Sequence, residues 1–248
     1  MQQLVLSFTD KSLTLLQKNE QALQVDQLPL ELNKPLIKER ISATIQAALQ
    51  QSSLYRSTWF APDYTLFPLN LFDPSQVQAY YELNHGKLPE AFSLRYDTIE
   101  SLELVVIYSV PKWLQEYCYN DLQNKQLQHE VSLQLRYLAT KKQADQIHVF
   151  FHEQQFVLTV FKQKQLLSCT ATPFQQESDF IYFLLAHQQK LKLDQSFNLS
   201  LTQASLDKPT QNLTSLLTKF KDFENFNIQE LPLNNYQNDI LCGSYEEH

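Results

Sequence analysis

The strongest constraint on the fold is a pattern that occurs twice in this chain. Residues 4–60 and 147–201 each read as two short apolar runs around a polar break, a third strand, an amphipathic helix and a closing strand. Matching apolar positions lie 143 residues apart, as in the pairs Leu4 and Ile147, Phe8 and Phe151, Leu13 and Phe156, and Leu23 and Leu166. Order and spacing are kept together, which favours an internal duplication over the alternative of two unrelated α/β units.

The residue types support the same elements. In the second copy, runs at 147–152, 155–161 and 165–170 are rich in Val, Ile, Phe, Leu and Thr, which suits adjacent antiparallel strands. A helix and a strand at 197–201 follow. In the first copy, strands are expected at 4–8, 12–18, 22–28 and 56–60, with a helix that begins near Pro35.

A further set of elements separates the two copies. Strands are expected at 64–69, 92–96 and 102–108. One helix follows the Asp73-Pro74 pair and ends at Gly86, a second begins at Pro111, and a third contains Val131 and Leu138. After residue 201 we expect a helix with Leu213, Leu216, Leu217 and Phe220, a strand at 226–231, and a polar, acidic tail from Asn234. The predicted domains are 1–142, which includes the inserted strands and helices, and 143–248.

Composition excludes several functional classes. The net charge is −7 with no basic cluster, so nucleic acid is not expected as a partner. No signal-peptide pattern and no apolar stretch of membrane-spanning length occurs, which predicts a cytoplasmic protein without membrane insertion. Cys118, Cys169 and Cys242 lack motif spacing and are expected to be reduced thiols in a core. Only two glycines are present, so phosphate-wrapping loops are not expected.

The repeated unit resembles the plan of the actin-like ATPase superfamily. Three passages, YTLFPLNLFDPSQVQAYYELNHG (64–86), IHVFFHEQQFVLTVFKQKQLL (147–167) and ESDFIYFLLAHQQKLKL (177–193), are similar to an uncharacterised bacterial family of that superfamily, a domain of unknown function. The resemblance implies an α/β, actin-like ATPase (ribonuclease H-like) fold of two duplicated subdomains, each with a mixed sheet plus helices, related to FtsA and PilM. Such motifs carry fold information and say little about chemistry.

The superfamily's ATP-binding motifs are missing at the positions that the resemblance assigns to them. The first phosphate loop usually reads Asp, apolar, Gly, Thr or Ser; the second begins Asp, apolar, Gly, Gly; and the adenosine loop carries a Gly pair. Here the first two positions hold Ser7, Phe8, Thr9, Asp10 and Phe150, Phe151, His152, Glu153, and the third holds Thr202 and Gln203. We therefore expect no cofactor, no catalytic residues and no ATP hydrolysis, and we regard these residues as a degenerate cleft.

Other possible sites have structural explanations. His148 and His152 share one strand face with Phe150, but a metal needs further ligands, so structural histidines are expected. Glu177 and Asp179 precede an apolar helix, where capping is the simpler role than acid–base catalysis. Several aromatic residues are expected in the core, with the alternative that some line a groove for a peptide: Trp59, Phe60, Tyr64, Phe67, Phe72, Tyr80 and Tyr81.

These observations lead to two functional hypotheses. The first is a catalytically inactive actin-like protein that serves as a cytoplasmic binding or scaffolding module for a protein or peptide partner. The second is a divergent nucleotide-binding ATPase or switch, for which Lys11, Lys162 and Lys164 near the turns are the only support.

Overall fold

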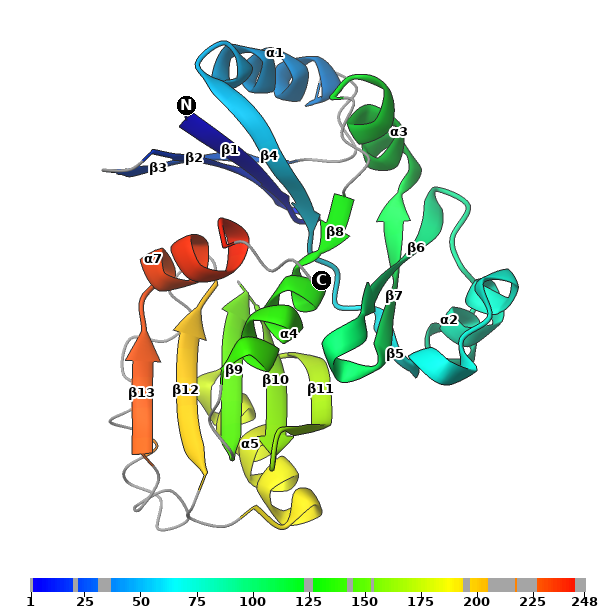
Figure 1. The fold of residues 1–248 in the computed structure, drawn as a ribbon, viewed down its shortest axis with the longest axis vertical. Coiled ribbons are helices and arrows are strands. Elements are labelled where there is room, and N and C mark those ends of the chain that lie inside the picture. Colours follow the sequence, from blue (N-terminus) through cyan, green and yellow to red (C-terminus); the bar gives the residue numbers. More distant parts are fainter. Residues whose placement is uncertain are drawn as a thin grey trace. The chain divides into compact units, whose positions relative to one another are not determined.

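The structure is a computed structural model of the chain (Figure 1). It describes residues 2–19, 22–30, 37–122, 127–141, 145–152, 154–193, 197–204, 217 and 227–243. By their internal contacts, residues 1–138 and 238–248 form one compact unit and residues 139–237 form another. We call them the first unit and the second unit. The domain bounds expected from sequence remain a prediction.

The first unit contains a five-stranded mixed sheet in the order β3-β2-β1-β4-β8. Strands β1, β2 and β3 are antiparallel, whereas β1, β4 and β8 run parallel to one another. Helix α1 (Ile37–Leu49) precedes β4 and buries Ile41 and Ile45, as the helical spacing predicted. The strands are β1 (Gln2–Phe8), β2 (Ser12–Lys18), β3 (Leu23–Pro29), β4 (Ser52–Trp59) and β8 (Leu127–His129).

The second unit repeats this topology. Its sheet has the order β11-β10-β9-β12-β13, with β9, β10 and β11 antiparallel and β9, β12 and β13 parallel. The elements are β9 (Gln146–His152), β10 (Gln155–Lys162), β11 (Gln165–Pro173), α5 (Glu177–Leu191), β12 (Asn198–Gln203) and β13 (Asn227–Leu231). The duplicated hairpin, third strand, helix and closing strand predicted from sequence are therefore confirmed.

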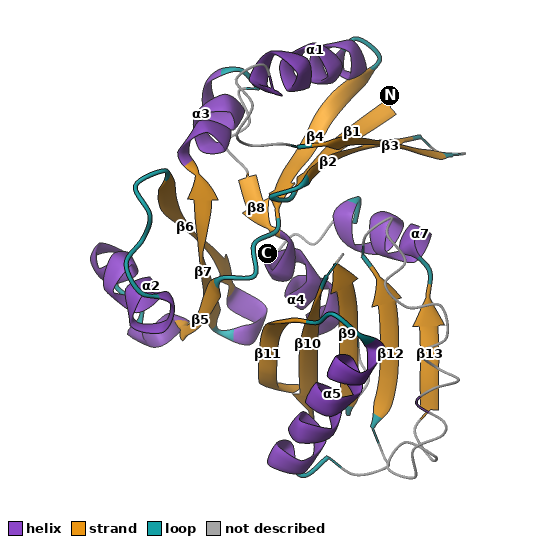
Figure 2. Cartoon of the chain, turned by 180° about the vertical axis from the view of Figure 1, so that it is seen from behind, coloured by secondary structure: helices purple, strands orange, loops and turns teal. Residues whose placement is uncertain are grey.

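Burial explains why these runs form strands. The central strands β1 and β9 are buried along most of their length and on both faces, which accounts for their near-continuous apolar sequences. In the second unit, α5 lies across one face of the sheet (Figure 2), and Phe180 and Leu184 of this helix pack with Phe156 and Leu158 of β10. Full burial of one such side chain contributes roughly 1.5–3 kcal/mol.

A smaller sheet is inserted between β4 and β8 in the first unit. Its order is β5-β7-β6, and neighbouring strands are antiparallel. Tyr81 of α2 packs with Val105 and Ile107 of β7. The predicted cap at Gly86 is confirmed, because this residue has φ of 76° and its N–H donates to the carbonyl of Glu82. The elements are β5 (Tyr64–Pro68), η1 (Leu69–Leu71), η2 (Pro74–Gln76), α2 (Val77–His85), β6 (Phe92–Ile99), η3 (Glu100–Leu102), β7 (Leu104–Pro111) and α3 (Lys112–Asn120).

The expectation of a polar tail from Asn234 was wrong for its first part. α7 (Leu233–Asn235) continues into η5 (Tyr236–Leu241), a π-helical turn. Tyr236, Ile240, Leu241 and Cys242 are buried despite the acidic composition of the segment. The helix expected around residues 213–220 lies outside the described residues, except for Leu217, which is helical and buried. None of the described helices is long and apolar enough to cross a membrane.

Candidate functional site

The carboxyl ends of parallel strands are where open α/β sheets bind ligands, and each unit contains one such set of strand ends. In the first unit, β1, β4 and β8 end at the same edge. The register places Ser7 beside Thr58 and Trp59 beside His129. Helix α4 (Glu130–Thr140) begins directly after β8, so its first residue lies at this edge.

Glu130 is the central polar group of this edge. Its side chain is only 2% exposed, and its Oε1 accepts hydrogen bonds from the Thr58 hydroxyl at 3.0 Å and from the Ser7 hydroxyl. Thr58 and Ser7 are buried as well. A carboxylate in the first turn of a helix is favoured by the helix dipole, and hydroxyl donors offset part of the cost of its burial. This edge therefore presents the Glu130 carboxyl oxygen, which accepts hydrogen bonds, whereas a bound phosphate would need groups that donate them.

The turn after β1 satisfies its own backbone groups. Thr9 N–H donates to the Ser12 carbonyl at 2.8 Å. The Thr9 hydroxyl oxygen in turn accepts from the N–H groups of Lys11 at 3.1 Å and Ser12 at 2.9 Å. Backbone amides of this kind form an anion cradle when they are free. Here three of them are used inside the turn, while Asp10 is exposed at its tip.

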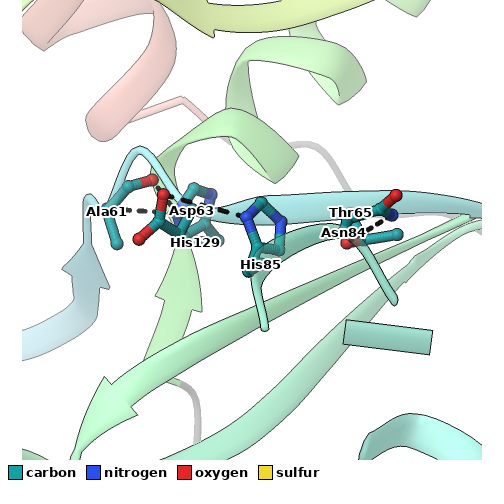
Figure 3. A network of polar contacts seen from close by, with 6 residues as sticks. All are labelled: Ala61, Asp63, Thr65, Asn84, His85 and His129. Atoms are coloured by element: carbon teal, nitrogen blue, oxygen red, sulfur yellow. Dashed lines mark hydrogen bonds and ion pairs between the residues drawn. The ribbon is translucent and has the colours of Figure 1, made fainter. Parts of the chain in front are cut away.

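His129 connects the edge to the loop after β4. Its Nδ1 accepts from the Val131 N–H at 3.3 Å, and its Nε2 lies 3.2 Å from the Ala61 backbone nitrogen and 3.0 Å from the Ala61 carbonyl oxygen (Figure 3). Burial lowers the pKa of His129 to about 3, so the imidazole is neutral at physiological pH. This histidine holds the loop and the start of α4 together.

A second buried carboxylate supports the same strand end. Asp97 Oδ2 accepts from the His129 N–H at 2.8 Å, and its Oδ1 lies 3.1 Å from the Tyr108 hydroxyl. Burial raises the pKa of Asp97, against the opposing effect of these hydrogen bonds. Burial also raises the pKa of Tyr108 well above its usual value, and the nearby Asp97 adds to this effect. The pair is a structural support beneath His129.

Two further polar contacts fasten the inserted sheet (Figure 3). His85 Nδ1 lies 3.8 Å from Asp63 Oδ1, and the Asn84 side chain donates to the Thr65 hydroxyl at 3.2 Å. His85 also contacts the ring of Tyr81, with centroids 4.7 Å apart. These contacts join the end of α2 to β5 and to the loop that carries Ala61.

The corresponding edge of the second unit is filled by aromatic side chains. Phe150 and His152, at the end of β9, are 1% and 5% exposed. Tyr236 packs against both, with ring centroids 5.9 Å from Phe150 and 5.8 Å from His152. Thr202 is buried beside Phe150 in the register of β9 and β12, and Gln203 is half-buried beside Phe151. Glu153 lies outside the described residues.

The remaining predicted site residues have structural roles. Asp179 accepts from the N–H groups of Gln175 and Gln176 in a capping box, and these bonds lower its pKa, as the capping interpretation predicted. His148 is packed beside Phe150, and burial lowers its pKa to about 4. Within the described residues, no group of three possible metal ligands comes together.

The aromatic residues singled out in the sequence divide into two sets. Trp59, Phe60, Tyr64 and Tyr81 are buried. The others form what we call the aromatic cluster, namely Phe67, Phe72 and Tyr80, joined by Tyr96 of β6. Tyr96 is 42% exposed and the neighbouring Leu71 is 65% exposed. This cluster is a partly open apolar surface of the kind that can receive another protein.

Sequence reasoning missed Thr58, Asp97, His129, Glu130 and Tyr236. The available signal was the His-Glu pair directly before the apolar helix that contains Val131. The predicted degenerate positions fall into two groups, Ser7, Thr9 and Asp10 at the end of β1, and Phe150, His152, Thr202 and Gln203 at the ends of β9 and β12. Each group lies at the carboxyl ends of parallel strands within its own unit.

Comparison with solved structures identifies the fold. A protein from Bacteroides thetaiotaomicron VPI-5482, described as having an actin-like ATPase fold and unknown function, is 17% identical with a TM-score of 0.72, covering 97% of this chain and 95% of that chain. A chain of the PilM–PilN type IV pilus biogenesis complex is 12% identical with a TM-score of 0.50, covering 93% of this chain and 88% of that one. No curated protein matches the chain. These likenesses show an actin-like ATPase fold, and because the family described as "Protein of unknown function (DUF3822)" matches residues 1–222, the chain belongs to that family.

Proposed function

We propose that this protein is a catalytically inactive member of the actin-like ATPase superfamily that acts as a cytoplasmic binding or scaffolding module for a protein or peptide partner. The observation that carries the proposal is the occupation of both strand-end edges by the protein's own side chains. In the first unit, the Thr9 hydroxyl accepts hydrogen bonds from the N–H groups of Lys11 and Ser12, and the buried Glu130 accepts one from Ser7. In the second unit, Tyr236 covers Phe150 and His152.

The hydrogen-bonding groups favour the same conclusion. At the end of β1, the Glu130 Oε1 accepts hydrogen bonds from Ser7 and Thr58, whereas a bound phosphate needs donors. Only two glycines are present in the chain, and neither lies in a strand-end turn where a phosphate loop would be expected. This distribution supports the absence of nucleotide chemistry.

A divergent nucleotide-binding ATPase or switch is the second candidate, and Glu130 is the observation that favours it. A buried carboxylate at the carboxyl ends of parallel strands, next to two hydroxyl groups, is positioned as a general base could be. Phosphate release from Mg-ATP separates the two candidates. We expect no turnover above buffer. Turnover that disappears in Glu130→Gln would establish the second candidate, whereas turnover that persists in this variant indicates a contaminating enzyme.

The aromatic cluster supports the binding half of the proposal. One of the solved structures with a similar fold is a complex of PilM with PilN. By analogy, we propose that the ligand of this chain is a segment of a partner protein. Substitution of Leu71 and Tyr96 by Asp should remove a partner that co-purifies with the wild-type protein from its native host. Leu83→Asp is the control, because it introduces the same charge at another exposed leucine, which is 85% exposed on α2. If the wild type, the variant at Leu71 and Tyr96, and Leu83→Asp all recover the partner equally well, this surface does not bind it.

A further inference from the structure

The edge strand β11 of the second unit has an unusual composition. Among the described strands it pairs only with β10, so one of its sides faces no other described strand. None of its nine residues, 165–173, is charged. Edge strands are protected against pairing with another chain by charges, by proline or by bulges, and in β11 the bulge and the proline lie only near the two ends of the strand, at Leu167 and Pro173. Its counterpart β3 follows this rule, because Asp26 lies exposed in the middle of that strand.

The pairing of β10 with β11 defines the part of the edge that is regular. Val160 pairs with Ser168 and Phe161 with Leu166, so Leu167 is an extra residue in a bulge and is 40% exposed. From Ser168 to Pro173 the ladder is uninterrupted. Thr170 is exposed within this stretch. This stretch of six uncharged residues, which ends at Pro173, pairs with β10 and with no other described strand.

Helix α5 borders this edge on one face of the sheet (Figure 2). His187 Nε2 lies 3.4 Å from the Thr170 hydroxyl, and Phe183, one turn earlier, packs against Phe156 with centroids 6.2 Å apart. Tyr182 is 68% exposed. A strand added to β11 would thus gain backbone hydrogen bonds and would lie beside a helix with aromatic side chains.

The two ends of the edge carry opposite charges. Lys162 and Lys164 lie at the turn that leads into β11, whereas Glu177 and Asp179 lie in the first turn of α5, just beyond its other end. An antiparallel pair of identical β11 strands brings the start of one copy, next to Lys164, to the end of the other, next to Glu177. The lysine end then faces the acidic end twice, once on each side of the two-fold axis.

We propose that two copies of this chain associate through β11, antiparallel about a two-fold axis near Thr170, so that the two sheets continue into one another. The uncharged strand removes repulsion at the centre, and the opposite charges at its ends select the antiparallel direction. The residues that pair about this axis, 168–172, make only a small contact together with one side of α5, so the dissociation constant is on the order of micromolar. The inference is independent of the function proposed above.

Sedimentation velocity of the full chain across about 1–200 µM at pH 8 tests this association. We expect concentration-dependent dimerisation that Thr170→Asp weakens at least about tenfold, because like charges then lie next to each other at the axis. The matched control is Gln27→Asp, which adds the same charge at the equivalent exposed position of β3, 143 residues earlier. This control should dimerise as the wild type does. A thermal melt of each variant establishes that it is folded.

Charge reversal tests the direction of pairing. Lys164→Glu and Glu177→Lys should each weaken the dimer, and the double variant should recover it. A wild-type chain that stays monomeric throughout the concentration range would overturn the proposal. So would a dimer that Thr170→Asp and Gln27→Asp affect equally, or a double variant that recovers nothing.

Discussion

The two units share one topology but fill their strand-end edges in opposite ways. In the first unit the edge is polar, with Glu130 buried between Ser7 and Thr58. In the second it is aromatic, with Tyr236 closing over Phe150 and His152. A duplicated sheet therefore keeps its strand order while the chemistry at its carboxyl ends diverges. We propose that both fillings occupy space that a phosphate would need.

The largest expected effect is at the aromatic edge. Tyr236→Ala should lower the free energy of unfolding by about 3–5 kcal/mol, because it removes a ring that is 1% exposed and leaves Phe150 and His152 beside a cavity. Urea denaturation measures this loss. Tyr182→Ala, at a ring that is 68% exposed, should change stability by less than about 0.5 kcal/mol. Equal, small effects of both substitutions would show that Tyr236 does not fill this edge.

The polar edge should respond somewhat less. Glu130→Ala leaves the buried hydroxyls of Ser7 and Thr58 without their acceptor, which should cost about 2–3 kcal/mol. Glu39→Ala, in the exposed first turn of α1, is the control and should stay within about 0.5 kcal/mol of the wild type. If Glu130→Ala were as stable as the control, the cluster would not hold the strand ends together.

Acid should weaken the polar edge through His129. Its folded-state pKa of about 3 lies below the ordinary value of 6.5, so the stabilisation is present above pH 6.5 and is lost as the pH falls towards 3. Between pH 7 and pH 5 this one group should remove about 2 kcal/mol from the free energy of unfolding. His129→Gln should lose about 2 kcal/mol less over the same interval. Parallel pH profiles for the two proteins would contradict this assignment.

The smallest effect is expected in the turn after β1. Thr9→Ala removes the hydroxyl that accepts from the N–H groups of Lys11 and Ser12, which should cost about 1 kcal/mol. Thr9→Ser retains the hydroxyl and should lose less than half of that amount. Denaturation midpoints of the two variants give the comparison. A loss of the same size in both would place the contribution of Thr9 in its methyl group.

Much of the fold was predictable because its signals are local or repeated. Runs such as 155–161 specify strands by residue type. The offset of 143 residues, which pairs such as Leu4 and Ile147 share, indicated the duplication. The predicted loss of the phosphate-loop sequences rested on missing glycines, which need no structure to notice. Caps at Gly86 and Asp179 were also predictable, because each depends on neighbouring residues only.

The rest depends on contacts between distant residues. Ser7 and Glu130 are 123 positions apart, and β8 has only three residues, too few for a strand pattern. Tyr236, Ile240 and Leu241 do form an apolar set in the tail, but its acidic neighbours obscured this signal. A buried polar cluster and a covering helix of this kind follow from tertiary packing, which sequence periodicity does not contain.

Calorimetric titration with Mg-ATP tests the central claim, that both strand-end edges are closed to phosphate. We predict no saturable heat up to millimolar nucleotide and no change of the melting temperature, for the wild type and for Tyr236→Ala alike. Saturable, magnesium-dependent binding by the wild-type chain, accompanied by a rise of its melting temperature, would contradict the account.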